Sequence, residues 1–147
     1  MMKTKKSKKK IKVKTLAKVT DNKIGFLRKN GVKSGPNEES TFNYLTLFGF
    51  NVELIRPSNT KKMRNPDIFI AGTIWEVKTP VSSNRNTIKK RFREASKQSA
   101  RVVFDLRYIK SGADQAKKQI VEMFKDSGRV RSLMIVGKDG ELLDFCK

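Results

Sequence analysis

Asn65-Pro66-Asp67-Ile68-Phe69-Ile70, Ala71-Gly72 and Thr73-Ile74-Trp75-Glu76-Val77-Lys78 make up the stretch that decides the fold. β-Branched and aromatic residues on both sides of Ala71-Gly72 predict two short strands joined by a tight hairpin. A two-residue loop would pair residue 70 with 73 and residue 67 with 76. Because side chains alternate between the two faces of a strand, Asp67, Glu76 and Lys78 are expected on one face. A bulge at Ala71, where a positive φ is unfavourable, would instead shift Asp67 by one position.

Two carboxylates that face each other across a hairpin repel and require a compensating charge. A divalent cation held by Asp67 and Glu76 supplies it, and Mg²⁺ or Mn²⁺ is the expected ion, with Zn²⁺ as an alternative. In the competing interpretation, Asp67 is a turn residue and Glu76 and Lys78 face solvent. The apolar neighbours on both strands favour burial, where an unpartnered carboxylate is costly.

Composition limits the chemistry that this chain can perform. The chain has 147 residues, with 34 Lys plus Arg against 14 Asp plus Glu and a net charge of +20, which favours a polyanionic partner such as nucleic acid. It contains no histidine, so histidine triads and histidine zinc ligands are excluded. Its single cysteine, Cys146, excludes a disulfide or a cysteine-ligated zinc site within one chain.

The remaining sequence predicts one domain. Residues 1–33 are basic and punctuated by glycine, so we expect a flexible arm there and a folded domain over residues 34–147. Helices are expected from Pro36 to Gly49 and over residues 87–99 and 113–125, and strands over residues 50–55, 102–106, 133–136 and 142–145 in addition to the hairpin. This order, αβββαβαββ, predicts an α/β or α+β domain around one mixed sheet flanked by helices.

Two basic segments are candidates for contact with phosphates. One is the loop before the hairpin, and the other is the second helix with the residue that follows it, where cations recur at helical spacing. A solvated helix surface is the alternative, but Glu94 is the only internal counter-charge to the repulsion in this helix. The candidate nucleic-acid-binding residues are Lys61, Lys62, Arg64, Lys89, Lys90, Arg93, Lys97 and Arg101.

Asp67, eight intervening residues, Glu76-x-Lys78 and the preceding Pro66 match the signature of PD-(D/E)XK nucleases. From about residue 38 to 106, the chain further resembles the C-terminal tRNA nuclease domain of contact-dependent growth inhibition (CdiA) toxins. The segments that carry this resemblance are Phe50-Asn51-Val52-Glu53, Arg56-Pro57-Ser58, Asn65-Pro66-Asp67, Trp75-Glu76-Val77-Lys78-Thr79-Pro80, Lys97-Gln98-Ser99 and Phe104-Asp105-Leu106-Arg107.

The resemblance implies a restriction-endonuclease-like fold and metal-dependent cleavage of tRNA. It assigns catalysis to Asp67, Glu76 and Lys78, and also to Glu39, as a further metal ligand, and Gln98. Glu39 could equally cap a helix, and Gln98 could equally be a polar surface residue.

We therefore expect a metal-dependent endonuclease that acts on tRNA or another structured RNA. A DNA endonuclease of the same fold and a non-catalytic, basic nucleic-acid-binding protein are the alternatives. The segment Ile11–Val19 is too often interrupted by charge to be a signal-peptide core or a membrane span, so no membrane partner is expected. The resemblance implies a toxin that acts in the cytoplasm and has a cognate immunity protein.

Overall fold

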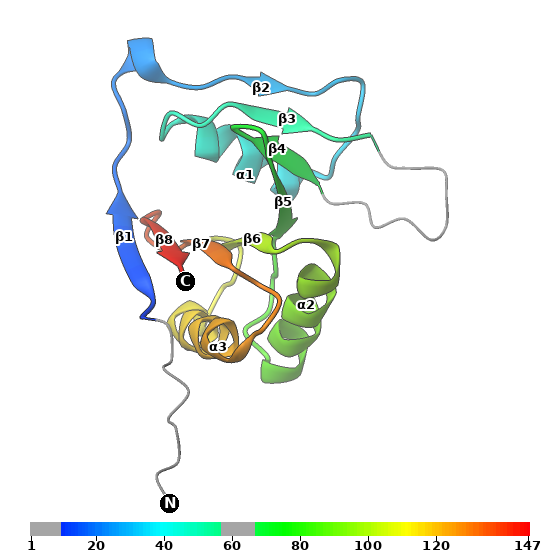
Figure 1. Ribbon diagram of the computed structural model, residues 1–147, viewed down its shortest axis with the longest axis vertical. Coiled ribbons are helices and arrows are strands. Elements are labelled where there is room, and N and C mark those ends of the chain that lie inside the picture. The colour runs from blue at the N-terminus through cyan, green and yellow to red at the C-terminus, as the bar shows by residue number, and fades with distance from the viewer. Residues whose placement is uncertain (1–9, 57–66) are drawn as a thin grey trace, which may run out of the picture.

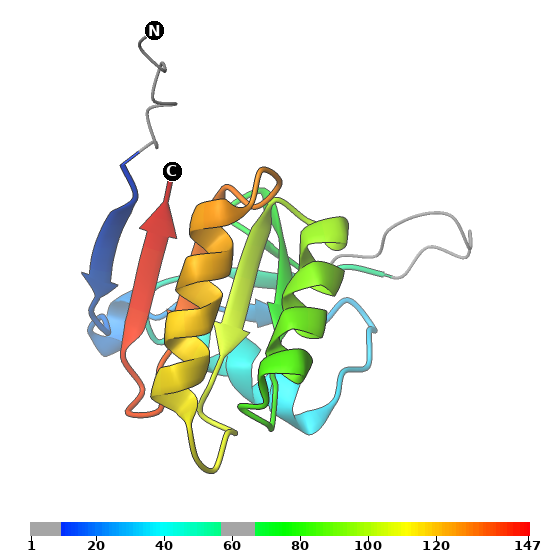
Figure 2. The ribbon, with the colours of Figure 1, turned by 90° about the horizontal axis from the view of Figure 1, so that it is seen from below.

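A computed structural model describes residues 10–56 and 67–147. In this part of the chain, an 8-stranded mixed sheet has the strand order β1-β8-β7-β6-β5-β4-β3-β2. Helices α2 and α3 cover one face of the sheet and α1 lies on the other (Figure 2). The expected architecture, a mixed sheet flanked by helices, is confirmed. Within the described residues, no helix is long and apolar enough to cross a membrane.

The elements from residue 36 onward follow the predicted order. Pro36 opens α1 at a position where its missing N–H costs nothing, and the side chain of Asn84 caps α2 by accepting from the amides of Asn86 and Thr87. The bounds are α1 (Pro36–Thr46), β3 (Val52–Leu54), β4 (Ile68–Ile70), β5 (Thr73–Lys78), α2 (Arg85–Gln98), β6 (Arg101–Asp105), α3 (Ala113–Asp126), β7 (Ser132–Val136) and β8 (Leu142–Cys146).

The sheet begins earlier in the chain than expected. Strand β1 (Lys12–Leu16) pairs antiparallel with β8, and after the 3₁₀ helix η1 (Asp21–Lys23), β2 (Leu27–Arg28) pairs parallel with β3 (Figures 1 and 2). The expectation that ordered structure starts near residue 34 is therefore wrong. Pairing with the edges of an existing sheet satisfies backbone groups of a segment whose own pattern is weak. A Cβ on Gly25 would lie 1.8 Å from the carbonyl oxygen of Phe50, so this glycine permits close backbone approach rather than simply breaking a helix.

Two hydrophobic cores lie on opposite faces of the sheet. Val102 and Phe104 of β6 pack with Ile88 and Phe92 of α2 and with α3, while Val103 packs on the side of α1. In β5, Trp75 and Val77 belong to the core on the α1 side. Because strand side chains alternate, Glu76 and Lys78 point toward the face that carries α2.

Candidate active site

The β4–β5 hairpin has the predicted register. Ala71 and Gly72 form the turn with φ values of +50° and +81°, so Ala71 accepts the left-handed conformation and the hairpin has no bulge. The paired residues are Ile68 with Trp75, Phe69 with Ile74 and Ile70 with Thr73. Asp67, directly before β4, is therefore level with Glu76.

Asp67 is held by the backbone of the strands on either side of it. Its Oδ2 atom accepts a hydrogen bond of 2.9 Å from the amide of Val77, and its carbonyl oxygen accepts one of 3.1 Å from the amide of Ile55. These two bonds fix the carboxylate beside β5 at the point where the β4 ladder has ended.

Glu76 is a buried carboxylate with incomplete compensation. Its exposed fraction is 4%, and its buried Oε1 atom has no hydrogen-bond partner in residues 10–56 and 67–147. Burial, followed by the hydrogen bond and the negative charge of Asp67, raises the pKa of Glu76 to about 8, although Lys78 acts in the opposite direction. The protein's own residues thus leave an acidic pair that a bound cation would satisfy.

Lys78 lies between two carboxylates. Its Nζ atom is 3.6 Å from Oε2 of Glu76 and 3.6 Å from Oε2 of Glu94, which extends from α2. Glu94 also pairs with Arg91 at 3.2 Å. Although partial burial acts in the opposite direction, Arg91 and Lys78 lower the pKa of Glu94. The sequence predicts Glu94 only as the internal counter-charge of its helix, and the signal for its contact with Lys78 is that it is an isolated acid among cations.

Glu39 is not brought to the hairpin acids. It forms an ion pair with Lys29, and its helix packs on the sheet face opposite Glu76. In the described residues, no three His, Cys, Asp or Glu side chains form a group that could hold a metal ion. The structure therefore assembles Asp67, Glu76 and Lys78 and leaves Glu39 apart from them.

Gln98 is the last residue of α2. It lines a shallow hollow of about 460 Å³ together with Ser99 and Arg129. The hydroxyl of Ser99 donates a hydrogen bond of 3.0 Å to the carbonyl oxygen of Ile74, which places this end of α2 beside the first half of β5.

The predicted basic ridge lies on the outer surface of α2. Its exposed cations line a hollow of about 510 Å³ that Glu94 borders as well, so the ridge runs next to the partner of Lys78. Arg101, at the start of β6, is only partly exposed. The ridge residues that line this hollow are Lys89, Lys90, Arg93 and Lys97. Lys61, Lys62 and Arg64 lie outside the described residues.

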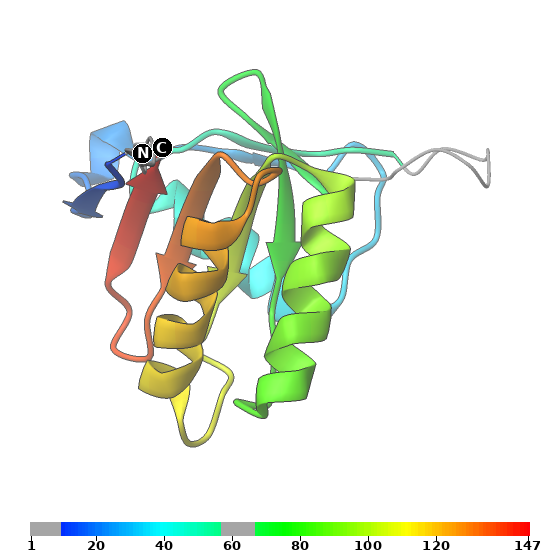
Figure 3. The ribbon, with the colours of Figure 1, turned by 60° about the horizontal axis from the view of Figure 1, so that its bottom comes forward.

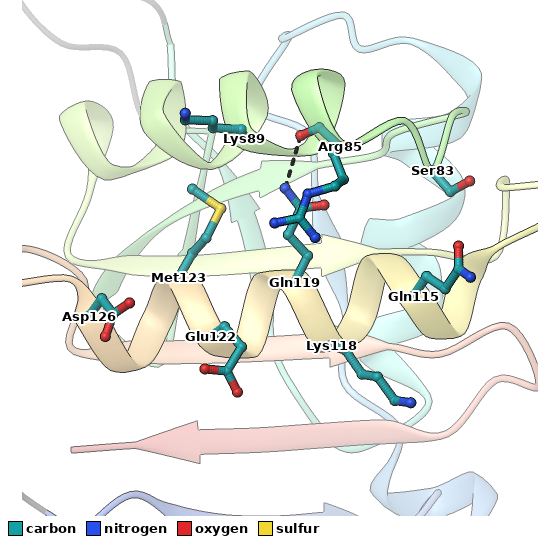
Figure 4. Close-up of a pocket in the computed structure, with 9 residues that line it drawn as sticks. All are labelled: Ser83, Arg85, Lys89, Gln115, Lys118, Gln119, Glu122, Met123 and Asp126. Carbon is teal, nitrogen blue, oxygen red and sulfur yellow. Dashed lines mark hydrogen bonds between the residues drawn. The ribbon is translucent and has the colours of Figure 1, made fainter.

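A separate hollow of about 670 Å³ lies between α2 and α3 (Figure 4). Gln119 donates a hydrogen bond of 2.9 Å to the carbonyl oxygen of Arg85 across it. Three basic residues, Arg85, Lys89 and Lys118, and two acidic residues, Glu122 and Asp126, line it, and none of the three hairpin residues does. This hollow is distinct from the acidic pair.

The fold and the site define a small mixed-sheet domain with a buried Asp–Glu pair beside a lysine. Residues 64–142 match the model of the contact-dependent growth inhibition CdiA C-terminal domain, which is more than half of the chain, and the chain belongs to this family of toxin domains. Membership indicates a toxic activity, which in CdiA C-terminal toxin domains is usually that of a nuclease.

The fold is similar to that of a chain in the CdiA-CT/CdiI toxin and immunity complex from Burkholderia pseudomallei. The TM-score is 0.57 at 16% sequence identity, and the match covers 82% of this chain and 98% of the other. No curated protein sequence matches the chain.

Proposed function

We propose that this domain is a metal-dependent endonuclease of the PD-(D/E)XK type that hydrolyses phosphodiester bonds in tRNA or another structured RNA. The observation that carries the proposal is the Glu76 carboxylate, which is buried beside Asp67 with the Lys78 ammonium 3.6 Å from one oxygen, while the other oxygen has no hydrogen-bond partner among the described residues. A structural carboxylate would be expected to have its oxygens satisfied by the protein.

Asp67 and Glu76 would hold the metal ion. Two carboxylates suit Mg²⁺ or Mn²⁺, which retain water ligands, whereas Zn²⁺ sites normally use at least three protein ligands. A role for Glu39 as a further ligand would require it to leave Lys29 and its helix to move from the opposite face of the sheet. When bound, the ion supplies Lewis acidity toward the scissile phosphate and lowers the pKa of water.

The remaining chemistry falls to the side chains of this chain. The ammonium of Lys78 is placed to orient a water molecule and to offset the negative charge that develops on the phosphate oxygens. The Val77 amide keeps Asp67 in position throughout. Because the chain has no histidine, proton transfer has to use carboxylates, Lys78 or water. Gln98 remains a candidate for a contact with the phosphate.

The charge distribution supports a nucleic-acid substrate. The chain has a net charge of +20, and the cations of α2 flank the site on the helix that also carries Glu94. Backbone phosphates along that ridge would position the substrate without reading its sequence.

A protein inhibitor is also part of the proposal. The similar fold from Burkholderia pseudomallei was solved as a toxin and immunity complex. A cell that makes a nuclease of this kind requires protection from it, and we infer that a cognate immunity protein binds this domain.

The test is cleavage of tRNA and of duplex DNA by the purified protein in Mg²⁺, Mn²⁺, Zn²⁺ or EDTA. We expect metal-dependent cleavage of tRNA that is lost in Asp67→Asn and Lys78→Met. Glu141→Gln, which removes a surface acid that pairs with Lys117, is the matched control and should cleave normally. Cleavage that persists in EDTA or in either site variant would contradict the proposal. Cleavage of DNA but not of tRNA would identify a DNA endonuclease. Binding of either nucleic acid without cleavage would indicate a non-catalytic binding protein.

A further inference from the structure

Among the described residues, helices cover only part of the sheet face that carries the acidic pair. Helices α2 and α3 lie over the strands from β5 to β8, and the tip of the β4–β5 hairpin extends beyond them (Figure 3). Leu27, Val52 and Ile68 pack into the core on the α1 side. Because side chains alternate along a strand, the next residue of each strand points to the uncovered face; these residues are Arg28, Glu53 and Phe69.

That uncovered face is rich in apolar and aromatic side chains. Phe69 of β4, which is partly buried, pairs directly with Glu53 of β3 and with Ile74 of β5, and Ile74 is 38% exposed. Phe26, directly before β2, is 39% exposed, and the guanidinium of Arg28 lies over its ring at 5.0 Å from the centroid. We call Phe26, Phe69 and Ile74 the open-face patch.

The open-face patch adjoins the acidic pair. Phe69 is two residues from Asp67 on the same face of β4, and Ile74 is two residues from Glu76 on the same face of β5. At a rise of about 3.3 Å per residue, Phe69 and Ile74 lie about 7 Å along the strands from the two carboxylates. Side chains at this spacing could hold the bases that flank a phosphate bound at the acidic pair.

Apolar side chains that are at least partly exposed on a strongly basic protein favour nucleic acid with unpaired bases as the partner. Nucleobases stack on aromatic and apolar side chains while cations bind the phosphates, whereas bases within a duplex present no free faces. The surroundings provide both parts, because Arg28, which also pairs with Glu53 at 3.1 Å, borders Phe26, and the Lys97 end of α2 adjoins Ile74 through the Ser99 hydrogen bond.

We propose that the open-face patch stacks unpaired bases next to the scissile phosphate, so that the domain cleaves RNA where the bases are unstacked, as in loops or single-stranded ends. This proposal rests on the proposed nuclease function and narrows its substrate. Phe69 and Ile74 hold the nucleotide nearest to Asp67 and Glu76, and Phe26 with Arg28 holds one farther away.

The test is binding in EDTA, so that no cleavage occurs, measured by fluorescence anisotropy. The probes are an unstructured, labelled RNA of about 12 nucleotides, a length within the range of stacking sites, and the same strand in a blunt duplex. Phe69→Leu keeps an apolar side chain but removes the ring, and Ile74→Ala shortens the neighbour. Val13→Ala is the control, because Val13 is 54% exposed on β1, at the other edge of the sheet.

We expect Phe69→Leu and Ile74→Ala to weaken single-strand binding by about 5- to 20-fold and to leave duplex binding and the salt dependence unchanged. Replacing the base nearest the cleavage site by 2-aminopurine should give quenching in the wild-type complex that Phe69→Leu relieves. Wild-type affinity of both variants for the single strand would overturn the proposal, and so would an equal loss for both probes. If Phe69→Leu weakened binding of an immunity protein but left the affinity for RNA unchanged, the patch would be the binding site of that protein instead.

Cleavage in Mg²⁺ or Mn²⁺ by the same preparations separates this inference from the proposed function. If the wild-type protein cleaves RNA and Phe69→Leu binds the single strand with unchanged affinity, the stacking patch is rejected and the nuclease function is retained. Selective loss of single-strand binding without any cleavage by the wild-type protein retains the patch and rejects the nuclease.

Discussion

The carboxylate of Asp67 accepts a hydrogen bond of 2.9 Å from the backbone amide of Val77, the residue that follows Glu76. Asp67 thus has two roles. One carboxylate oxygen accepts from the β5 backbone beyond the end of β4, and the negative charge of Asp67 lies next to the buried Glu76. A substitution that keeps the hydrogen bond but removes the charge separates these two roles.

Asp67→Asn is expected to fold normally and to lose metal binding. The amide oxygen can still accept from Val77, so the free energy of unfolding should change by less than about 0.5 kcal/mol. Loss of a residue that only supports a metal ligand typically lowers metal affinity by about 10- to 100-fold. Asp67 is proposed to bind the ion directly, so the Mn²⁺ affinity of Asp67→Asn, measured by calorimetry, should fall by at least this factor. Asp67→Ala should cost about 1 kcal/mol more stability because the Val77 amide loses its acceptor. Unchanged Mn²⁺ affinity in Asp67→Asn would remove this carboxylate from the metal site.

Glu76→Gln should stabilise the metal-free protein, increasingly as the pH rises. The folded state raises the pKa of Glu76 from 4.5 to about 8, so between these values the unfolded chain binds fewer protons and the wild-type protein loses stability with rising pH. The slope is at most about 1.4 kcal/mol per pH unit, and the variant lacks it. Below pH 4.5 the two proteins should be equally stable, and above pH 8 the difference should be constant.

Urea unfolding in EDTA at several pH values measures this difference, with Glu122→Gln, an exposed helix acid, as the control. Parallel stability curves for the wild-type protein and Glu76→Gln would contradict the burial of an ionisable carboxyl at this position.

Glu94→Gln tests whether the second carboxylate positions Lys78. The variant keeps the shape of the side chain but removes one of the two anions 3.6 Å from the ammonium. We expect kcat to fall by about 10-fold because Lys78 is held less firmly, while KM stays equal or decreases because a negative charge near the phosphates is gone. Glu94→Asp should recover part of the rate. An unchanged kcat would reduce Glu94 to a surface ion pair.

The hairpin and its register could be predicted from the sequence because strand periodicity and a two-residue reversal determine which side chains share a face. The prediction held even though Ala71 needs a positive φ, which the pairing on both sides of the turn imposes. Local pattern was therefore sufficient to bring Asp67 and Glu76 together.

Features that depend on packing between distant segments could not be read in this way. Glu39 was placed on a helix correctly, but nothing local discloses that this helix packs on the sheet face opposite Glu76. Strands β1 and β2 exist because β8 and β3 offer them edges, and the exposure of Phe26 follows from that pairing. The contact of Glu94 with Lys78 likewise requires α2 to lie on β5.

Asp105 is expected to be a determinant of stability rather than of catalysis. It is fully buried at the end of β6, where it pairs with Arg107 at 2.7 Å and accepts a hydrogen bond of 2.5 Å from Thr41 of α1. Asp105→Asn leaves Arg107 without its counter-charge and should cost about 3 kcal/mol, whereas Thr41→Val removes one hydrogen bond and should cost about 1 kcal/mol. Urea unfolding measures both, and near-equal stability of Asp105→Asn and the wild-type protein would contradict a structural ion pair.

The α2 ridge should determine the salt dependence of RNA binding. Each phosphate contact that is lost reduces the slope of log K against log salt by about 0.7 for single strands, so the double variant Lys89→Ala/Arg93→Ala should lower it by about 1.4. The control is Lys117→Ala/Lys125→Ala on α3, which removes the same charge from residues already paired with Glu141 and Glu122. If the two double variants reduce the slope equally, net charge alone attracts the RNA, and the ridge makes no specific contact. If the slope falls only in the α2 variant and kcat at saturating RNA is unchanged, the phosphate backbone lies along α2, the helix whose Glu94 pairs with Lys78.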